Sequence, residues 1–227
     1  MRRVFLVVEG QTERRFADEV LAPHLQQYGL WLSTVIVATR RDAAGGKHRG
    51  GGKWKQWSRD LSQLLRVQDS PEVRVTTMLD LYGLPGDFPG LAAARALKDT
   101  DQRALALEQA MGEALGDPRL IPNIVRYEFE TLVLAALDAL ETILENATDW
   151  RGLGTLRKEI GSTVPEDIND GPNSAPSKRL IKHMPGYRKT LHGPAALASA
   201  GLPALRARCA RFDRWVSKLE ALGEVQP

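Results

Sequence analysis

Short apolar runs alternate with amphipathic stretches along the first 150 residues. Residues 2–8 (RRVFLVV), 31–39 (WLSTVIVAT) and 73–79 (VRVTTML) are rich in apolar and β-branched side chains, which is typical of buried strands. Residues 13–28 place apolar side chains at helical spacing, and a further helix is predicted over residues 54–67. This order predicts right-handed β-α-β units, and therefore an α/β fold with a mostly parallel sheet flanked by helices.

The rest of the chain is predicted to be mainly helical. A helical region is expected over residues 91–115, a short strand over 123–127 and another helix over 131–146. We therefore expect an α/β domain over residues 1–150 and a helical C-terminal extension over residues 151–227, packed together as one structural unit.

Acidic residues stand where the predicted strands end. Glu9 follows the first strand, Asp80 the third, and Glu128 and Glu130 the short strand near residue 125. The carboxyl ends of parallel strands meet at one edge of a sheet, where α/β proteins bind ligands, so these carboxylates are expected to converge. Mg²⁺ binds through carboxylates, water and substrate phosphates, and two such ions ~4 Å apart promote phosphodiester cleavage. The alternative is that each acid only caps a helix or a turn.

The corner after the first strand carries a second acid. Gly10 permits a sharp turn, Thr12 is the expected N-cap of the following helix, and Glu13 then lies in its first turn. Pro23 is expected to kink the last turn of that helix. With one more acid from the loop that follows the third strand, the candidate metal ligands are Glu9, Glu13, Asp80, Asp87, Glu128 and Glu130.

A glycine-rich basic segment precedes the helix that begins near Trp54. It is not a phosphate-binding P-loop, because Gly52 and Lys53 are followed by Trp54 rather than by Ser or Thr. Its cations could instead contact a nucleic-acid backbone while Trp54 and Trp57 stack on bases; the alternative is a solvated loop. The candidate nucleic-acid-binding residues are Arg40, Arg41, Lys47, Arg49, Lys53 and Lys55.

Lys178 opens a second basic run, which continues through Lys182, Arg188 and Lys189. A cation next to the acids could stabilise negative charge in the transition state of phosphoryl transfer, so Lys178 is a candidate catalytic residue. The alternative is that the run forms the hydrated face of a helix.

Composition narrows the choice of function classes. The net charge of +3 and pI of 9.1 permit nucleic-acid binding without demanding it. The single cysteine, Cys209, excludes an internal disulfide and a multi-cysteine zinc site. No apolar run approaches the ~20 residues that cross a bilayer, and Arg2 and Arg3 are followed by only five apolar residues before Glu9, unlike a signal peptide. We expect a cytoplasmic protein without membrane contact.

Seven short motifs are spread over nearly the whole chain: 8–13 (VEGQTE), 76–83 (TTMLDLYG), 87–90 (DFPG), 127–130 (YEFE), 165–170 (PEDIND), 175–179 (APSKR) and 209–215 (CARFDRW). Their combination resembles a bacterial domain-of-unknown-function family, DUF4276. That family is similar to Toprim domains, the metal-dependent α/β modules of topoisomerases, primases and nucleases of the overcoming-lysogenization-defect (OLD) type. The resemblance implies a Toprim-like fold in which Glu9 serves as acid or base. It also implies an Asp-x-Asp metal pair, of which this chain has Asp80 but carries Tyr82 in the second place.

The function implied is that of a Mg²⁺- or Mn²⁺-dependent nuclease, or another phosphotransfer enzyme that acts on nucleic acid. Glu9 would be general base or metal ligand and Asp80 the principal ligand. Resemblance to split nuclease systems implies a separate ATPase chain as partner and a role in anti-phage defence. Two alternatives stay open: a Toprim-like subunit without catalytic activity that binds an ATPase or nucleic acid, and a toxin-like effector with a narrow substrate such as tRNA.

Overall fold

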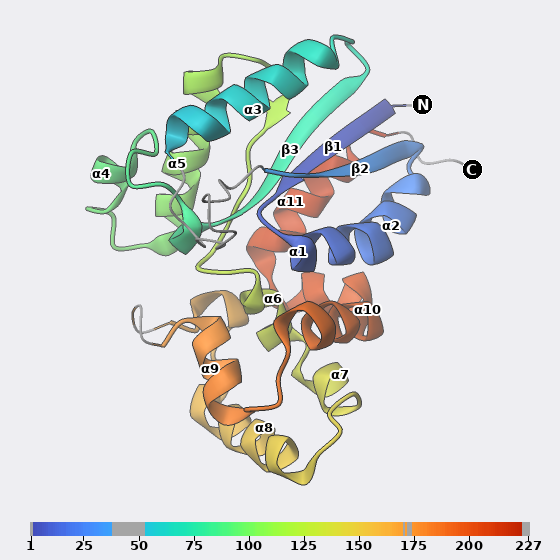
Figure 1. Ribbon diagram of the computed structural model, residues 1–227, viewed down its shortest axis with the longest axis vertical. Coiled ribbons are helices and arrows are strands. Elements are labelled where there is room, and N and C mark those ends of the chain that lie inside the picture. Colours follow the sequence, from blue (N-terminus) through green and yellow to red (C-terminus); the bar gives the residue numbers. More distant parts are fainter. Residues whose placement is uncertain (1, 38–52, 170, 172–173, 224–227) are drawn as a thin grey trace, which may run out of the picture.

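A five-stranded parallel sheet forms the centre of the α/β half of the molecule (Figure 1). The computed structural model describes residues 2–37, 53–169, 171 and 174–223. The strand order is β2-β1-β3-β4, and β5 pairs with the last residues of β3; every pairing is parallel. The strands are β1 (Arg2–Val8), β2 (Leu30–Ile36), β3 (Val73–Asp80), β4 (Leu120–Ile121) and β5 (Ile124–Val125).

Side chains of β1 are buried on both faces of the sheet, as its continuous apolar sequence predicts for a central parallel strand. Val4, Leu6 and Val8 belong to one hydrophobic core, whereas Val7 belongs to the core on the opposite face. The first core is closed by α1 (Gln11–Phe16), α2 (Ala22–Gln26) and α11 (Ala210–Glu220), and the second by α3 (Trp54–Val67), α4 (Leu91–Ala94) and α5 (Thr100–Leu115).

The C-terminal half is mainly helical. In Figure 1, α7, α8 and α9 lie beyond the carboxyl edge of the sheet, with α6 and α10 between them and the strands. These helices are α6 (Glu130–Ala135), α7 (Leu137–Glu141), α8 (Ala147–Ile160), α9 (Pro176–His183) and α10 (Lys189–Arg208). One continuous set of buried apolar residues runs from Val4 of β1 to Leu219 of α11. The predicted fold class is therefore confirmed, and the predicted division near residue 150 stays a prediction.

The first helical region departs from prediction in two respects. Thr12 is not the N-cap: α1 begins at Gln11, and Gly10 holds the N-cap position with an extended backbone. The predicted continuous helix is instead α1, a π-helical segment (Ala17–Leu21) and α2. The π-helical segment ends two residues before Pro23, which has no backbone N–H for the carbonyl oxygen of Glu19 and so interrupts the regular α-helical hydrogen bonds.

Other predicted helices are also divided. The region 91–115 contains α4 and α5, because Asp99 caps a new helix by accepting hydrogen bonds from the backbone N–H groups of Asp101 and Gln102. The predicted strand 123–127 is shorter, since Tyr127 has a φ of +63° and leaves the extended conformation. No described helix is both long enough and apolar enough to cross a membrane.

Candidate functional site

Glu9 and Asp80 meet at the carboxyl edge of the sheet, at the ends of the neighbouring strands β1 and β3. The backbone N–H of Asp80 donates a hydrogen bond to Glu9 Oε1 at 2.7 Å, and Asp80 Oδ1 accepts one from the backbone N–H of Phe129 at 2.8 Å. Three chain segments that are far apart in sequence are thus joined through two carboxylates. A Cβ at Gly83 would lie 2.7 Å from Glu9 Oε2, so only glycine allows the chain after β3 to pass so close.

Glu13 and Glu130 add two buried carboxylates, which are 9% and 5% exposed. Glu13 lies in the first turn of α1, and Glu130 is the first residue of α6. Glu130 Oε1 lies 3.0 Å from Nζ of Lys189, the first residue of α10. Within the described chain, Lys189 is the cation that forms an ion pair with this group of acids.

Glu128 completes the acidic group, which we call the acidic site: Glu9, Glu13, Asp80, Glu128 and Glu130. Glu128 Oε2 accepts a hydrogen bond from the backbone N–H of Ser177 at 3.0 Å. This bond places the start of α9 beside the acids, because the first backbone N–H groups of a helix have no partner within it. Lys178 follows directly in the chain.

The acids perturb one another. Burial is the main cause that raises the pKa of Glu9 to about 7; the hydrogen bond from Asp80 opposes this rise and the charge of Glu13 adds to it. Burial also raises the pKa of Asp80 well above its usual range, and the charges of Glu9, Glu13, Glu130 and Glu128 raise it further. The pKa of Glu13 is raised by burial and by Glu130, while Lys189 acts in the opposite direction. The site therefore concentrates negative charge against low-dielectric surroundings.

This donor set fits a hard divalent cation by its chemistry. Mg²⁺ and Mn²⁺ prefer carboxylate oxygens, and a bound cation would offset the repulsion between the acids, which adds to the effect of burial on these pKa values. The present arrangement is held by protein hydrogen bonds instead. Among the described residues, no three His, Cys, Asp or Glu side chains lie close enough together to hold a metal ion.

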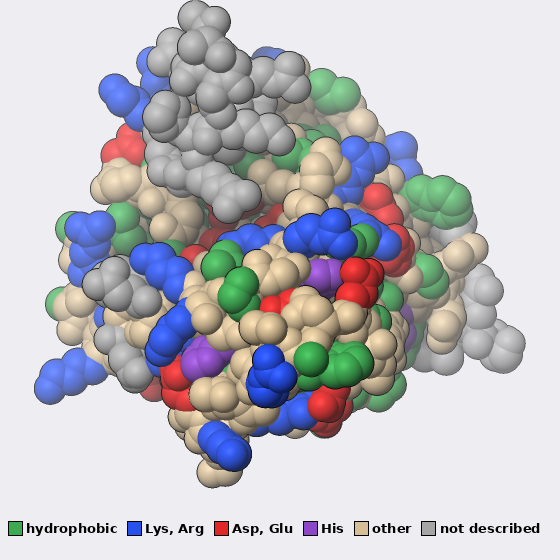
Figure 2. Space-filling view, turned by 60° about the horizontal axis from the view of Figure 1, so that its bottom comes forward, with side chains coloured by type: hydrophobic (Ala, Val, Ile, Leu, Met, Phe, Trp, Pro, Cys, Tyr) green, Lys and Arg blue, Asp and Glu red, His purple; other side chains and the backbone are tan. Residues whose placement is uncertain are grey.

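Asp87 contacts the start of α3 and is not part of the acidic site as defined above. Its Oδ1 accepts a hydrogen bond from the backbone N–H of Trp54 at 2.8 Å, which caps the first turn of α3. Lys178 lines a hollow of about 390 Å³ on α8 and α9, together with Glu159 and Lys182. Figure 2 shows lysine and arginine side chains spread over the helical half. The predicted ligand role of Asp87 and the predicted catalytic role of Lys178 stay predictions.

Part of the predicted nucleic-acid contact lies outside the described residues, namely Arg40, Arg41, Lys47 and Arg49. Lys53 and Lys55 are described, and both are exposed at the start of α3. The expectation that Trp57 stacks on bases is wrong, because this residue is only 4% exposed on the inner face of the amphipathic α3. Trp54 packs edge-on against Phe88, with ring centroids 4.9 Å apart.

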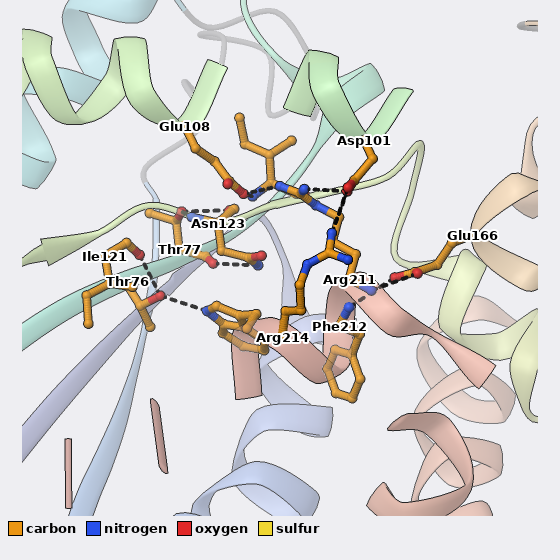
Figure 3. Close-up of polar contacts among 12 residues, drawn as sticks. Thr76, Thr77, Asp101, Glu108, Ile121, Asn123, Glu166, Arg211, Phe212 and Arg214 are labelled. Atoms are coloured by element: carbon orange, nitrogen blue, oxygen red, sulfur yellow. Dashed lines mark hydrogen bonds and ion pairs between the residues drawn. The ribbon is translucent and has the colours of Figure 1, made fainter. Parts of the chain in front are cut away.

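The chain segment of β5, which leads to Glu128 and Glu130 of the acidic site, is held in place by Arg211 at the start of α11 (Figure 3). Arg211 Nε donates to the carbonyl oxygen of Ile124 in β5 at 3.0 Å, Nη1 donates to Asp101 at 2.7 Å, and Nη2 pairs with Glu108. Both oxygens of Glu166 accept backbone N–H groups of Arg211 and Phe212, at 2.9 and 3.0 Å. We call these residues the arginine hub: Arg211, Asp101, Glu108 and Glu166.

The arginine hub explains two motifs that the sequence left without a role. Residues 165–170 and 209–215 supply Glu166 and Arg211, whose contacts fix β5 and therefore the segment that carries Glu128 and Glu130. Lys189 was visible in the sequence only as one member of a basic run. Its pairing with Glu130 depends on the fold and could not be read from spacing.

Comparisons with known proteins found a family match and a structural similarity. The family model described as "Domain of unknown function (DUF4276)" matches residues 8–220. The chain is structurally similar to the C-terminal region of the Burkholderia pseudomallei OLD protein, with a TM-score of 0.44 and 17% sequence identity, covering 98% of this chain and 100% of that one. None of the curated proteins matches the sequence.

Proposed function

The chain belongs to the DUF4276 domain family, and we propose for it the function that its acidic site supports best, divalent-metal-dependent hydrolysis of phosphodiester bonds in nucleic acid. The observation that carries the proposal is the gathering of five carboxylates from two strand ends, a helix start and the β5–α6 segment, with Lys189 as their paired cation among the described residues. Buried like charges destabilise a fold, so a group of them at a ligand-binding sheet edge is favourable when a cation binds there.

Each acid has a proposed task. Glu9, with a pKa of about 7, can accept a proton from an attacking water near neutral pH. Asp80 and Glu130 would hold the cation through their carboxylate oxygens, and Glu13 and Glu128 would add ligands to it. When bound, the cation supplies Lewis-acid stabilisation of the phosphate charge. Lys189 can balance the charge that is left on Glu130.

A cleavage assay tests the proposal. Purified protein is incubated with single- and double-stranded DNA and RNA in Mg²⁺ or Mn²⁺, with and without EDTA. We expect cleavage that needs the metal and falls by at least about a hundredfold in Glu9→Gln and Asp80→Asn. Glu113→Gln, an exposed acid on α5, is the matched control and should retain activity. Equal cleavage by all four proteins would contradict the assignment.

One observation favours a second candidate, a subunit that binds nucleic acid or an ATPase without cleaving. Tyr82 stands where the resemblance places the second metal aspartate, and its hydroxyl accepts a hydrogen bond from the side-chain amide of Asn169. A phenol is a poor ligand for Mg²⁺. This candidate predicts nucleic-acid binding without cleavage under every metal condition.

The separate ATPase partner and the role in anti-phage defence stay proposals that rest on the resemblance to split nuclease systems. Co-purification with an ATPase encoded beside this chain, followed by the same cleavage assay with ATP, tests both. An assembly that cleaves only when both chains and ATP are present would support them, whereas failure of the chains to associate would contradict them.

A further inference from the structure

We propose that Tyr82 stacks on an unpaired base, so that the nucleic acid taken by the acidic site is single-stranded at the point of contact. The inference rests on the proposed function and deepens it by naming the substrate class. It starts from an aromatic side chain that is exposed beside buried carboxylates, in a chain whose tryptophans on α3 pack inward or against Phe88.

The backbone ties Tyr82 to the acidic site on both sides. The residue lies two positions after Asp80, in a 3₁₀ turn (Leu81–Gly83) whose last residue passes against the carboxylate of Glu9. Its backbone N–H donates to the carbonyl oxygen of Tyr127 at 3.1 Å, and Tyr127 directly precedes Glu128. A base held by Tyr82 would therefore place its own phosphates next to the acids.

The ring of Tyr82 is held in place but only partly covered. Its centroid lies 5.6 Å from that of Tyr127 at an interplanar angle of 52°, and Tyr127 is 7% exposed whereas Tyr82 is 41% exposed. The amide of Asn169 donates to the Tyr82 hydroxyl, which restricts rotation of the side chain. An aromatic ring that is already oriented loses little conformational entropy when a base stacks on it.

Tyr127 adopts a backbone conformation that a residue without structural demand would avoid. Its φ of +63° is unusual for a non-glycine residue, and the Oγ1 of Thr100 lies 3.2 Å from its hydroxyl. This backbone geometry accompanies the contact between the Tyr127 and Tyr82 rings, and Glu128 of the acidic site follows directly in the chain. Backbone strain of this kind persists where the surrounding contacts enforce it.

Two arginines lie near the tyrosine pair. The guanidinium of Arg126 is 5.7 Å from the centroid of the Tyr127 ring and pairs with Asp167 at 2.6 Å, and the charge of Arg103 acts on Tyr82. A phosphate backbone that approaches the acids needs such cations to offset repulsion. Aromatic rings beside arginine are the usual means of holding single-stranded nucleic acid without sequence preference.

Single-stranded substrate follows from the geometry of stacking. In a duplex both faces of each base are covered by neighbouring bases, so a fixed surface tyrosine cannot reach one without unstacking the helix. The competing interpretation is that Tyr82 only covers Tyr127 and contributes packing. The two differ in what removal of the ring does to binding.

Fluorescence anisotropy separates the two interpretations. Labelled oligo(dT) and oligo(rU) of about 12 nucleotides, within the usual site sizes, and a duplex of equal length are titrated with full-length protein in EDTA, where cleavage is absent. Stacking contributes about 1–3 kcal/mol per base, so Tyr82→Ala should weaken binding of one or both single strands by roughly 5- to 150-fold. Tyr82→Phe keeps the ring and should remain within about threefold of the unmodified protein, because the lost hydroxyl contact is only one neutral hydrogen bond.

Trp31→Ala is the matched control, since Trp31 is 54% exposed on β2 at the opposite end of the strands. It should leave binding unchanged. Unchanged affinity in Tyr82→Ala, or tighter binding of the duplex than of either single strand, would overturn the inference. Photocrosslinking of 5-bromouracil oligonucleotides, followed by mass spectrometry, gives a readout that needs no variant: the adduct should map to Tyr82, and adducts that map only elsewhere would overturn it.

The results also separate this inference from the proposed function. Tyr82-dependent binding without metal-dependent cleavage would support the stacking site and contradict the proposed nuclease activity. Cleavage that is equally efficient on duplex and single strand, in both the unmodified protein and Tyr82→Ala, would support the nuclease activity and contradict the stacking site.

Discussion

The acidic site and the arginine hub are both groups of buried and partly buried charged side chains, yet their charges are balanced differently. In the hub, Arg211 Nη1 lies 2.7 Å from Asp101, its Nη2 pairs with Glu108, and Glu166 is satisfied by two backbone N–H groups. In the acidic site, five carboxylates face one paired cation of the described chain, Lys189. Buried charge that is matched within the protein holds the fold, and buried charge that is left unmatched is available to a ligand.

The pKa shifts of these acids reflect, in part, the difference in charge balance between the arginine hub and the acidic site. Burial alone would raise the pKa of Asp101, but the hydrogen bond and charge of Arg211 and the charge of Arg214 lower it below its usual range. Burial raises the pKa of Glu108 in spite of the opposing effect of Arg211. For Asp80 of the acidic site the charges of the neighbouring acids act in the same direction as burial, and its pKa is raised well above its usual range.

The largest effect is expected from Arg211→Ala. Removal of this guanidinium leaves Asp101 and Glu108 without their buried partner and takes a donor from β5, so the free energy of unfolding should fall by about 3–5 kcal/mol. Arg214→Ala is the matched control, because Arg214 pairs with the same Asp101 but its side chain is 51% exposed, and should lose less than about 1 kcal/mol. Urea titrations measure the free energy of unfolding of both variants. Similar losses in the two would contradict the claim that the buried contacts of Arg211 hold the fold.

The acidic site predicts a pH dependence of stability in EDTA. The pKa of Glu9 is raised in the folded protein from 4.5 to about 7, so the folded state binds more protons than the unfolded state between these values. The contribution of this group is fully present below pH 4.5 and is lost as the pH rises through about 7, by about 3 kcal/mol. Glu9→Gln should remove this part of the pH dependence, whereas Glu113→Gln should keep it. A stability that rises across the same range and is unaffected by Glu9→Gln would contradict the assignment.

A smaller effect is expected from Lys189→Met. At pH 8 in EDTA, loss of the ion pair with Glu130 should cost about 1–2 kcal/mol, less than for a fully buried pair, because the Lys189 side chain is 24% exposed. Millimolar Mg²⁺ should recover most of this loss if a cation can take over the neutralisation of Glu130. Thermal unfolding with and without Mg²⁺ measures it, and a variant that is more stable than the unmodified protein without metal would show that Lys189 is not a needed counter-ion.

Much of the fold could be predicted because local pattern and burial agree there. The runs at 2–8 and 73–79 form β1 and β3, and α3 has the predicted bounds. The exact helix divisions could not be predicted, since they depend on local hydrogen bonds. Asp99 starts a new helix by its side chain, and Pro23 stands next to a π-helical segment rather than a simple kink.

The site was predictable where strand ends dictate position. Glu9, Asp80 and the Glu128–Glu130 segment do meet at one sheet edge, as a parallel sheet requires. The tertiary partners were not predictable, because Lys189, Ser177 and Arg211 reach this region from segments with no fixed spacing to the strands. In the sequence, Tyr82 was notable only because it stands where the second aspartate of the Toprim pattern is expected. Its exposure could not be predicted, because exposure is a property of the folded surface.

Metal binding tests the central claim, that the unmatched carboxylates form a cation site. Free Mn²⁺ is measured by electron paramagnetic resonance during titration into metal-free protein at pH 7.5. We predict that the unmodified protein binds Mn²⁺, that Asp80→Asn and Glu9→Gln each weaken the binding by roughly tenfold or more, and that Glu113→Gln does not. Absence of binding, or equal binding by all four proteins, would contradict the claim that this acidic site is a metal site.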